Sequence, residues 1–273
     1  MRITAATDPG SAKPNEDAFI ASEHVLVVVD GATARTETRC REGVSVYAYR
    51  LASALAHHAA DRSKSMQDAL AAAIGDVTAM HDPACDLTFD GTPCAVLAAA
   101  RPNGDLLEWI VLGDVTLAID HDKGLDVHRV THRHVGERYR DEADRYPIGD
   151  PRKAEVLLQM KQEEHAWRNR PGGYWVASTD PTVAYQALTG AVTLADVTSV
   201  GIFSDGAARL ADLFVETDFD GLLAMAAKSG PTTIIDRVRA LEHADPLGER
   251  YPRNKRSDDA TAIYATLSAP GAS

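Results

Sequence analysis

The stretch AFIASEHVLVVVDG at residues 18–31 shows how this chain is built. Two short apolar runs surround the turn Ser22-Glu23-His24, which predicts a pair of strands. The second run is continuously apolar, as expected for a strand that is buried on both faces. It ends in Asp30-Gly31, so a carboxylate directly follows a strand of the predicted core.

The segments that follow predict a helical layer and then more strands. Residues 43–60 and 65–81 carry apolar side chains at helical spacing, and Ser65 with Asp68 is a helix start signal. Residues 93–130 contain short apolar runs separated by turns, which predicts an antiparallel meander. Gly113-Asp114 is interpreted as a hairpin turn within this meander.

The second half of the chain continues the mixture of helix and strand. Residues 131–172 are polar and predict an inserted loop region with some helix around 153–168. The remaining apolar patterns predict strands at 173–178, 197–204 and 260–267 and helices at 219–229 and 232–244. No repeating βαβ unit is present, so the fold class is α+β. We expect one domain over residues 1–267 and a flexible tail at 268–273.

Composition and charge are those of an ordinary soluble globular protein. The 273 residues are 45% hydrophobic and 25% charged, and the formal net charge is −12. An acidic surface disfavours nucleic acid and anionic membranes as partners. The start of the sequence lacks the apolar core of a secretion signal, and no apolar run is long enough to span a bilayer. We therefore expect a cytoplasmic protein, and we expect it to be a monomer.

The three cysteines, Cys40, Cys85 and Cys94, are an odd number and have no CxxC spacing. This pattern predicts neither a disulfide framework nor a zinc cluster. We expect buried or incidental thiols.

Short acidic turns follow or end several apolar runs. They are Asn15-Glu16-Asp17, Asp30-Gly31, Gly113-Asp114, Ser204-Asp205-Gly206 and Asp258-Asp259. Each of them alone is explained as an ordinary turn or cap. Carboxylates that gather at strand ends repel one another unless a divalent cation neutralises them. Because oxygen-only ligands suit a hard cation and not zinc, the five together predict a site for Mg²⁺ or Mn²⁺.

The order and spacing of these motifs resemble the metal-dependent protein phosphatase family of type 2C, the PPM family. That family shows "ED", "DG", a "GTT"-like turn, "GDS", "SDG" and finally "DN" or "DD" before the last strand. The matching residues here are Glu16-Asp17, Asp30-Gly31, Gly91-Thr92-Pro93, Gly113-Asp114-Val115, Ser204-Asp205-Gly206 and Asp258-Asp259, from about residue 5 to residue 267. The resemblance implies an αββα sandwich, in which two antiparallel sheets are flanked by helices.

The resemblance also implies a site for two cations, with a third, weaker one in bacterial members. The implied metal ligands are Glu16, Asp17, Asp30, Gly31, Asp114, Asp205 and Asp258. Asp30 would bridge two ions, and the Gly31 carbonyl would bind one of them. Asp30, Asp205 and Asp258 are the implied catalytic residues. Glu16 and Asp17 would act through bound waters, and Asp114 with Asp205 would match the position of the third ion.

The activity implied by the resemblance is hydrolysis of phosphomonoesters, with phosphoserine and phosphothreonine proteins as the first expectation, by a metal-bound hydroxide. Residues 131–172 would form a flap near the active site. Family members carry an Arg four residues before the Glu of "ED"; here that position is Ala12, and its neighbour Lys13 could bind the substrate phosphate as a point charge.

Two alternatives stay open: a weak or inactive regulatory module with the PPM fold, and a PPM-fold phosphatase for a small-molecule phosphate. A haloacid-dehalogenase-like enzyme is disfavoured because Val28 and Asp30 do not fit its DxDxT loop.

Overall fold

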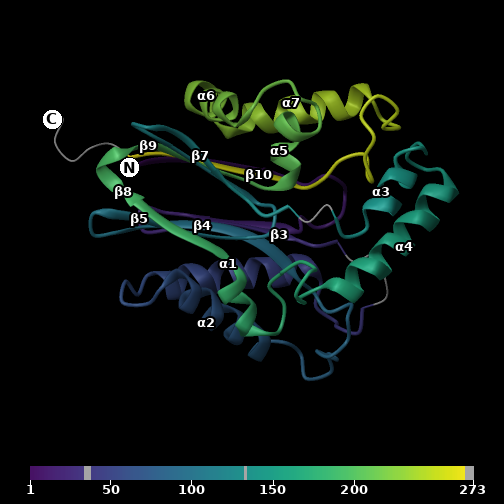
Figure 1. The fold of residues 1–273 in the computed structure, drawn as a ribbon, viewed down its shortest axis with the longest axis horizontal. Helices are drawn as coiled ribbons and strands as arrows, with labels where there is room; N and C mark the ends of the chain where they lie inside the picture. The colour runs from purple at the N-terminus through teal and green to yellow at the C-terminus, as the bar shows by residue number, and fades with distance from the viewer. Residues whose placement is uncertain (34–37, 132–133, 268–273) are drawn as a thin grey trace.

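A computed structural model describes residues 1–33, 38–131 and 134–267 (Figure 1). Within these residues, two five-stranded antiparallel sheets lie face to face. The first sheet has the order β1 (Arg2–Asp8), β10 (Ala260–Thr266), β9 (Val197–Phe203), β6 (Thr116–His121) and β7 (Gly124–His128). The second has the order β2 (Asp17–Ala21), β3 (Leu26–Gly31), β4 (Ala95–Asn103), β5 (Leu106–Leu112) and β8 (Leu188–Thr193).

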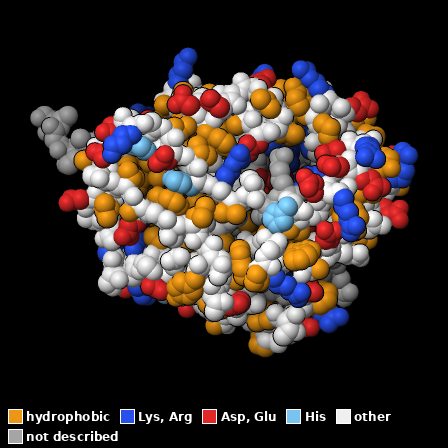
Figure 2. Space-filling view, in the orientation of Figure 1, with side chains coloured by type: hydrophobic (Ala, Val, Ile, Leu, Met, Phe, Trp, Pro, Cys, Tyr) orange, Lys and Arg blue, Asp and Glu red, His pale blue; other side chains and the backbone are white. Residues whose placement is uncertain are grey.

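Helices cover both outer faces of this sandwich, as Figure 1 shows. The second sheet is covered by α1 (Val44–Ala59) and α2 (Met66–Ala79). The first sheet is covered by α5 (Asp205–Asp212), α6 (Phe219–Ser229) and α7 (Pro231–Ala244). Two more helices, α3 (Glu137–Ala143) and α4 (Pro151–Trp167), lie at one end of the sandwich, where acidic and basic side chains gather in Figure 2. The predicted αββα sandwich is therefore confirmed.

The continuous apolar run of β3 has a simple explanation in this arrangement. Val27 and Val29 pack with α1 and α2 in one hydrophobic cluster. Leu26 and Val28 point to the opposite face and pack in the cluster between the two sheets. A strand whose alternate side chains enter two cores has no polar face, which is why its sequence shows no alternation.

Most of the predicted elements are found close to their predicted bounds. The helices at 43–60, 65–81, 219–229 and 232–244 correspond to α1, α2, α6 and α7, and the Ser65 side chain caps α2 by accepting the Asp68 N–H. The helix expected around 153–168 is α4. The sequence analysis missed β1, β8, α3 and α5. The tail at 268–273 lies outside the described residues.

The meander prediction is wrong in one respect. The hairpin β4–β5 belongs to the second sheet, whereas β6–β7 belongs to the first, so Gly113-Asp114 joins the two sheets and is not a hairpin turn. Gly113 has φ +88°, and a Cβ there would lie 2.2 Å from Val96 Cγ1. Glycine is needed because both the dihedral and the close approach exclude a side chain.

The strand predicted at 173–178 is also wrong. This segment forms only isolated bridges, between Ala95 and Ala177 and between Arg168 and Tyr174. Tyr174 and Val176 instead pack in a small cluster with Cys94 and Val135. The apolar residues that suggested a strand are therefore buried by packing and not by pairing within a sheet.

The expectation of three incidental thiols is wrong for two of them. Cys40 and Cys85 form a disulfide, whereas Cys94 is a free, buried thiol. The pairing depends on how the segment before α1 packs on the segment after α2, which the spacing of cysteines does not reveal. Among the helices that the structure describes, none combines the length and the apolar character that crossing a bilayer requires.

Candidate metal centre

The acidic motifs come together at one end of the sandwich. In the second sheet, Asp17 at the start of β2 is the direct cross-strand partner of Asp30 near the end of β3. At the first sheet, Asp205 begins α5 after Ser204, which follows β9, and Asp258 lies two residues before the neighbouring strand β10. The two sheets meet where the Asp205 N–H donates a hydrogen bond to Asp30 Oδ2 at 3.4 Å. Antiparallel pairing puts the end of one strand beside the start of the next, which explains this convergence.

Mutual repulsion and burial perturb these carboxyl groups. The pKa of Asp30 lies well above its ordinary value because the group is buried and because Asp205, Asp17, Asp258 and Asp114 surround it. Acidic residues that are far apart in the sequence are therefore close enough in space to repel one another.

Two neighbours of Asp30 are shifted in the same direction. Burial raises the pKa of Asp17 to about 7; hydrogen bonds from Ser204 and Thr261 lower it in part, and Asp258 and Asp259 raise it further. The pKa of Asp205 is also raised, by desolvation and by Asp258 and Asp114. Because Asp205 is exposed to solvent, water screens part of that repulsion.

The donor set fits a hard divalent cation. The side chains that converge here offer only oxygen atoms, which is the chemistry that Mg²⁺ and Mn²⁺ prefer. Asp17 Oδ2 is buried and has no hydrogen-bond partner among the described residues. A buried carboxylate oxygen without a donor is costly, and a cation would compensate it.

The carboxylates are not drawn into a tight cluster. Over the described part of the chain, no three of them bring one oxygen each within 4.8 Å of one another. Like charges repel, and Asp258 is held by basic side chains: Arg209 donates to its Oδ2 at 2.9 Å, and Lys255 contacts its Oδ1.

Sequence reasoning missed the basic residues that position Asp258. Arg209 also donates to Glu242, whose side chain is fully buried, at 2.6 Å. Arg239 donates to the same carboxylate at 2.7 Å and to the Asp258 carbonyl at 2.7 Å. In the sequence, Arg209 stands near Asp205 and Lys255 stands near Asp258. Such spacings between basic and acidic residues are too common to indicate a site.

Lys255 carries its charge into the acidic site. Its Nζ donates to Thr33 Oγ1 at 3.2 Å in addition to its contact with Asp258. Burial alone would lower the pKa of Lys255, but Asp258, Asp205 and Asp30 outweigh burial and raise it. Lys255 is therefore an ammonium group that neutralises part of the site.

The backbones of Glu16 and Gly31 are in direct contact at the edge of the second sheet. The Gly31 N–H donates to the Glu16 carbonyl at 3.1 Å, and a Cβ on Gly31 would lie 2.6 Å from that oxygen. The Glu16 carboxylate accepts a hydrogen bond from Thr33 at 2.6 Å. Asp259 accepts from the N–H groups of Gly10 and Glu16 at 2.7 and 2.6 Å, so it orders the loop that carries Glu16.

Of the two remaining predicted site residues, Asp114 lies near the acidic site and Lys13 does not. Asp114 lies close enough to raise the pKa values of Asp30 and Asp205. Lys13 is exposed, and its side chain makes no hydrogen bond or ion pair with the described residues; only its N–H is bonded, to Ser11. The structure thus brings the predicted acidic residues together and leaves Lys13 at the surface.

Comparison with known proteins identifies the family of this chain. A family model described as "Protein phosphatase 2C" matches residues 10–239. The chain belongs to this family. Its members are metal-dependent phosphoric monoester hydrolases, which is the enzyme class that the sequence predicted. A search of curated proteins finds no match.

Solved structures of bacterial phosphatases share the fold of this family member. The serine/threonine phosphatase PstP/Ppp of Mycobacterium tuberculosis has a TM-score of 0.58 at 16% identity, covering 98% of this chain and 99% of that chain. Stp1 of Staphylococcus aureus has a TM-score of 0.57 at 15% identity, covering 98% and 95%. The catalytic domain of PstP in complex with two manganese ions has a TM-score of 0.55 at 17% identity, covering 98% of both chains.

Proposed function

We propose that this chain is a metal-dependent phosphatase that hydrolyses phosphomonoesters, with phosphoserine and phosphothreonine proteins as its substrates. The observation that supports this proposal is the convergence of Asp17, Asp30, Asp205 and Asp258 from both sheets. A pure scaffold has no need of clustered carboxylates that repel one another. We further propose that residues 1–267 form one domain and that it acts as a cytoplasmic monomer.

Glu16, Asp17, Asp30, Asp205, Asp258 and the Gly31 carbonyl would hold two Mg²⁺ or Mn²⁺ ions, and Asp114 with Asp205 would hold a third. Two bound ions neutralise phosphate charge and lower the pKa of a water molecule. The PstP structure with two manganese ions supports manganese as one choice. Arg209 and Arg239 keep Asp258 in place, and Lys255 adds a positive charge that favours an anionic substrate beside the carboxylates.

We propose that residues 131–172 act as the flap that shapes substrate choice. Lys161, His165 and Arg168 of this segment line a small hollow together with Thr33, whose hydroxyl bonds Glu16. Arg168 donates to the Thr92 carbonyl at 3.5 Å and to the Asp90 carbonyl. The end of α4 is therefore held beside Thr33, the donor to Glu16, and this contact supports a role of the segment in shaping access to the acidic site.

A regulatory module without turnover is the second candidate. Two observations favour it: Ala12 stands where relatives carry the phosphate-binding Arg, and Lys255 contacts Asp258, a predicted metal ligand. An ammonium group at a ligand competes with a cation for the same oxygen.

Hydrolysis of p-nitrophenyl phosphate separates the two candidates. We expect turnover with Mn²⁺ that falls at least roughly 100-fold with EDTA and in Asp30→Ala. Asp236→Asn, on the exposed face of α7, is the matched control and should retain the wild-type rate. The absence of turnover in the folded wild type would favour the module, whereas an equal rate in Asp30→Ala would contradict catalysis at the acidic site.

The substrate class needs a second experiment. A phosphopeptide should be hydrolysed with a higher kcat/KM than sugar or nucleotide phosphates; the reverse order would favour the small-molecule alternative. If Lys13 binds the phosphate, Lys13→Ala should raise KM and leave kcat nearly unchanged. An unchanged KM would remove Lys13 from the site.

A further inference from the structure

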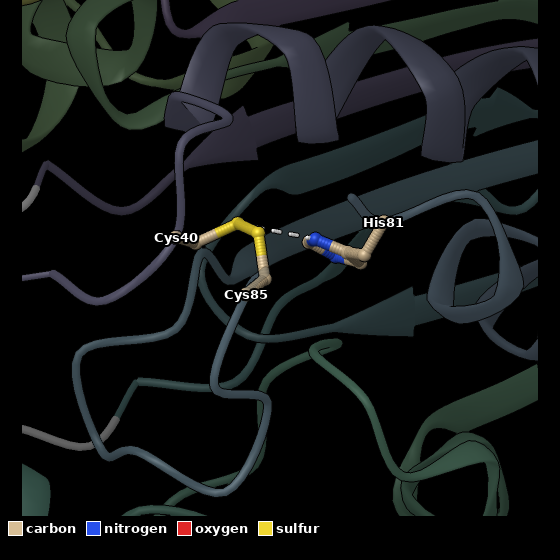
Figure 3. A group of neighbouring side chains, drawn as sticks. All are labelled: Cys40, His81 and Cys85. Carbon is tan, nitrogen blue, oxygen red and sulfur yellow. Dashed lines mark hydrogen bonds between the residues drawn. A yellow bond between two sulfur atoms is a disulfide. The ribbon is translucent and has the colours of Figure 1, made fainter. Parts of the chain in front are cut away.

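A second group of metal-ligating side chains lies outside the acidic site (Figure 3). Cys40 precedes α1, and His81 and Cys85 follow α2. His81 Nδ1 lies 3.3 Å from Cys40 Sγ. One ligand atom from each of the three residues falls within 4.8 Å of the others, and no other group of three in the described residues meets this criterion.

The histidine in this group is not explained by the disulfide. The His81 side chain is 1% exposed. Its Nε2 is buried with no hydrogen-bond partner among the described residues. Its Nδ1 faces the sulfur atoms and lies 3.7 Å from Glu42 Oε2. A disulfide needs no imidazole beside it, and a buried polar ring that is poorly paired costs free energy. A ligand role for Nδ1 would account for the orientation of the ring toward the sulfur atoms.

We propose that the reduced Cys40–Cys85 pair and His81 bind one Zn²⁺ ion. A tetrahedral zinc with sulfur at about 2.3 Å and nitrogen at about 2.0 Å separates these ligand atoms by roughly 3.5 Å. The observed distance of 3.3 Å between His81 Nδ1 and Cys40 Sγ is close to this value. Two thiolates and a neutral imidazole balance the charge of Zn²⁺, and a water takes the fourth position, since Glu42 Oε2 is already bonded to Arg50 at 2.6 Å.

The two states interconvert by ordinary thiol chemistry. A dithiol reductant supplies two electrons and two protons to the Cys40–Cys85 bond, and it is itself converted to a disulfide. Zn²⁺ then displaces the two thiol protons and is neither oxidised nor reduced. Oxidation of the two thiolates by a disulfide-forming oxidant restores the sulfur–sulfur bond and releases the ion.

Both the disulfide and the zinc-bound state would join the segment before α1 to the segment after α2. The Asp86 N–H donates to the Arg39 carbonyl at 3.1 Å, and the two side chains form an ion pair at 3.3 Å. The segment from Cys85 continues to Asp90 and Thr92, whose carbonyls accept from Arg168 of the proposed flap. A zinc ion would therefore preserve this cross-link where reductants keep thiols free, as in a cytoplasm.

Cobalt is the probe that tests this site, because thiolate ligands give Co²⁺ an intense near-ultraviolet charge-transfer absorption that oxygen ligands do not. In chelator-free buffer with a dithiol reductant removed before titration, the wild type should develop this absorption and saturate at one equivalent. Zn²⁺ should abolish it. Cys94→Ser, which removes the thiol outside the group, should behave like the wild type, whereas Cys85→Ser should show no such absorption.

His81→Gln should weaken Co²⁺ binding at least roughly tenfold while part of the thiolate absorption remains. The oxidised wild type is a folded control that needs no substitution, and it should show no thiolate absorption. The proposal is overturned if the reduced wild type has two free thiols beyond Cys94 and binds no Co²⁺ through them. It is also overturned if Cys85→Ser or the oxidised protein gives the wild-type spectrum.

Discussion

Asp17 gives a sharp test of the electrostatics of the acidic site. Its carboxyl group is almost fully buried, one of its oxygens has no partner among the described residues, and its pKa is raised from 3.8 to about 7. A raised carboxyl pKa means that the folded state holds its proton at pH values where the unfolded chain has lost it. The free energy of unfolding of the metal-free protein should therefore fall as pH rises from about 4 to about 7, and then level off.

The magnitude follows from the size of the shift. Each pKa unit corresponds to about 1.4 kcal/mol, so the part of the window between pH 5 and pH 7 is worth about 3 kcal/mol. Because the Asp17 carboxyl group is electrostatically coupled to its surroundings, the measured proton uptake belongs to the coupled site and not to Asp17 alone. We expect Asp17→Asn to reduce the loss of stability between pH 5 and pH 8 by about 2–3 kcal/mol relative to the wild type.

Urea denaturation in EDTA at pH 5 and pH 8 measures this difference. Asp236→Asn is the control, because Asp236 is exposed on α7 and the substitution should leave the pH dependence unchanged. Comparing the slope with pH, and not the stability at one pH, removes the effect of the new amide on packing. The reasoning is refuted if the wild type gains stability over this range, or if Asp17→Asn loses as much stability as the wild type.

Three other substitutions test separate parts of the structure. Glu242→Gln should lower the free energy of unfolding by about 3 kcal/mol in a urea titration, because it leaves two partly buried guanidinium groups without their shared, fully buried carboxylate; an unchanged midpoint contradicts this. Lys255→Met should lower the Mn²⁺ concentration for half-maximal phosphatase activity about threefold to tenfold, because it removes a competing cation from Asp258; a higher requirement would instead assign Lys255 to holding the site together. Cys85→Ser, measured in EDTA against the oxidised wild type, should cost up to about 4 kcal/mol because the disulfide closes a loop with a sequence separation of 45; equal stability would show that this loop is fixed by its other contacts.

The sequence determined much of the local structure and pointed to the acidic residues that the fold brings to one end of the sandwich. The apolar run that ends in Asp30 predicted a strand buried on both faces, because periodicity records which sides of a segment meet the core. The Ser65 cap and the bounds of α1, α6 and α7 follow from propensity and spacing within each segment. These features depend on neighbours in the chain, so one sequence is enough to read them.

The tertiary structure alone decided which distant residues meet. Nothing near Gly113 in the sequence shows that the next strand enters the other sheet, and nothing near Cys40 points to Cys85 and His81. Arg209 and Arg239 are common surface residue types, and only the packing of α5 and α7 beside the start of β10 turns them into partners of Asp258. Contacts through space leave no period in the sequence, because each depends on how whole helices and sheets are arranged.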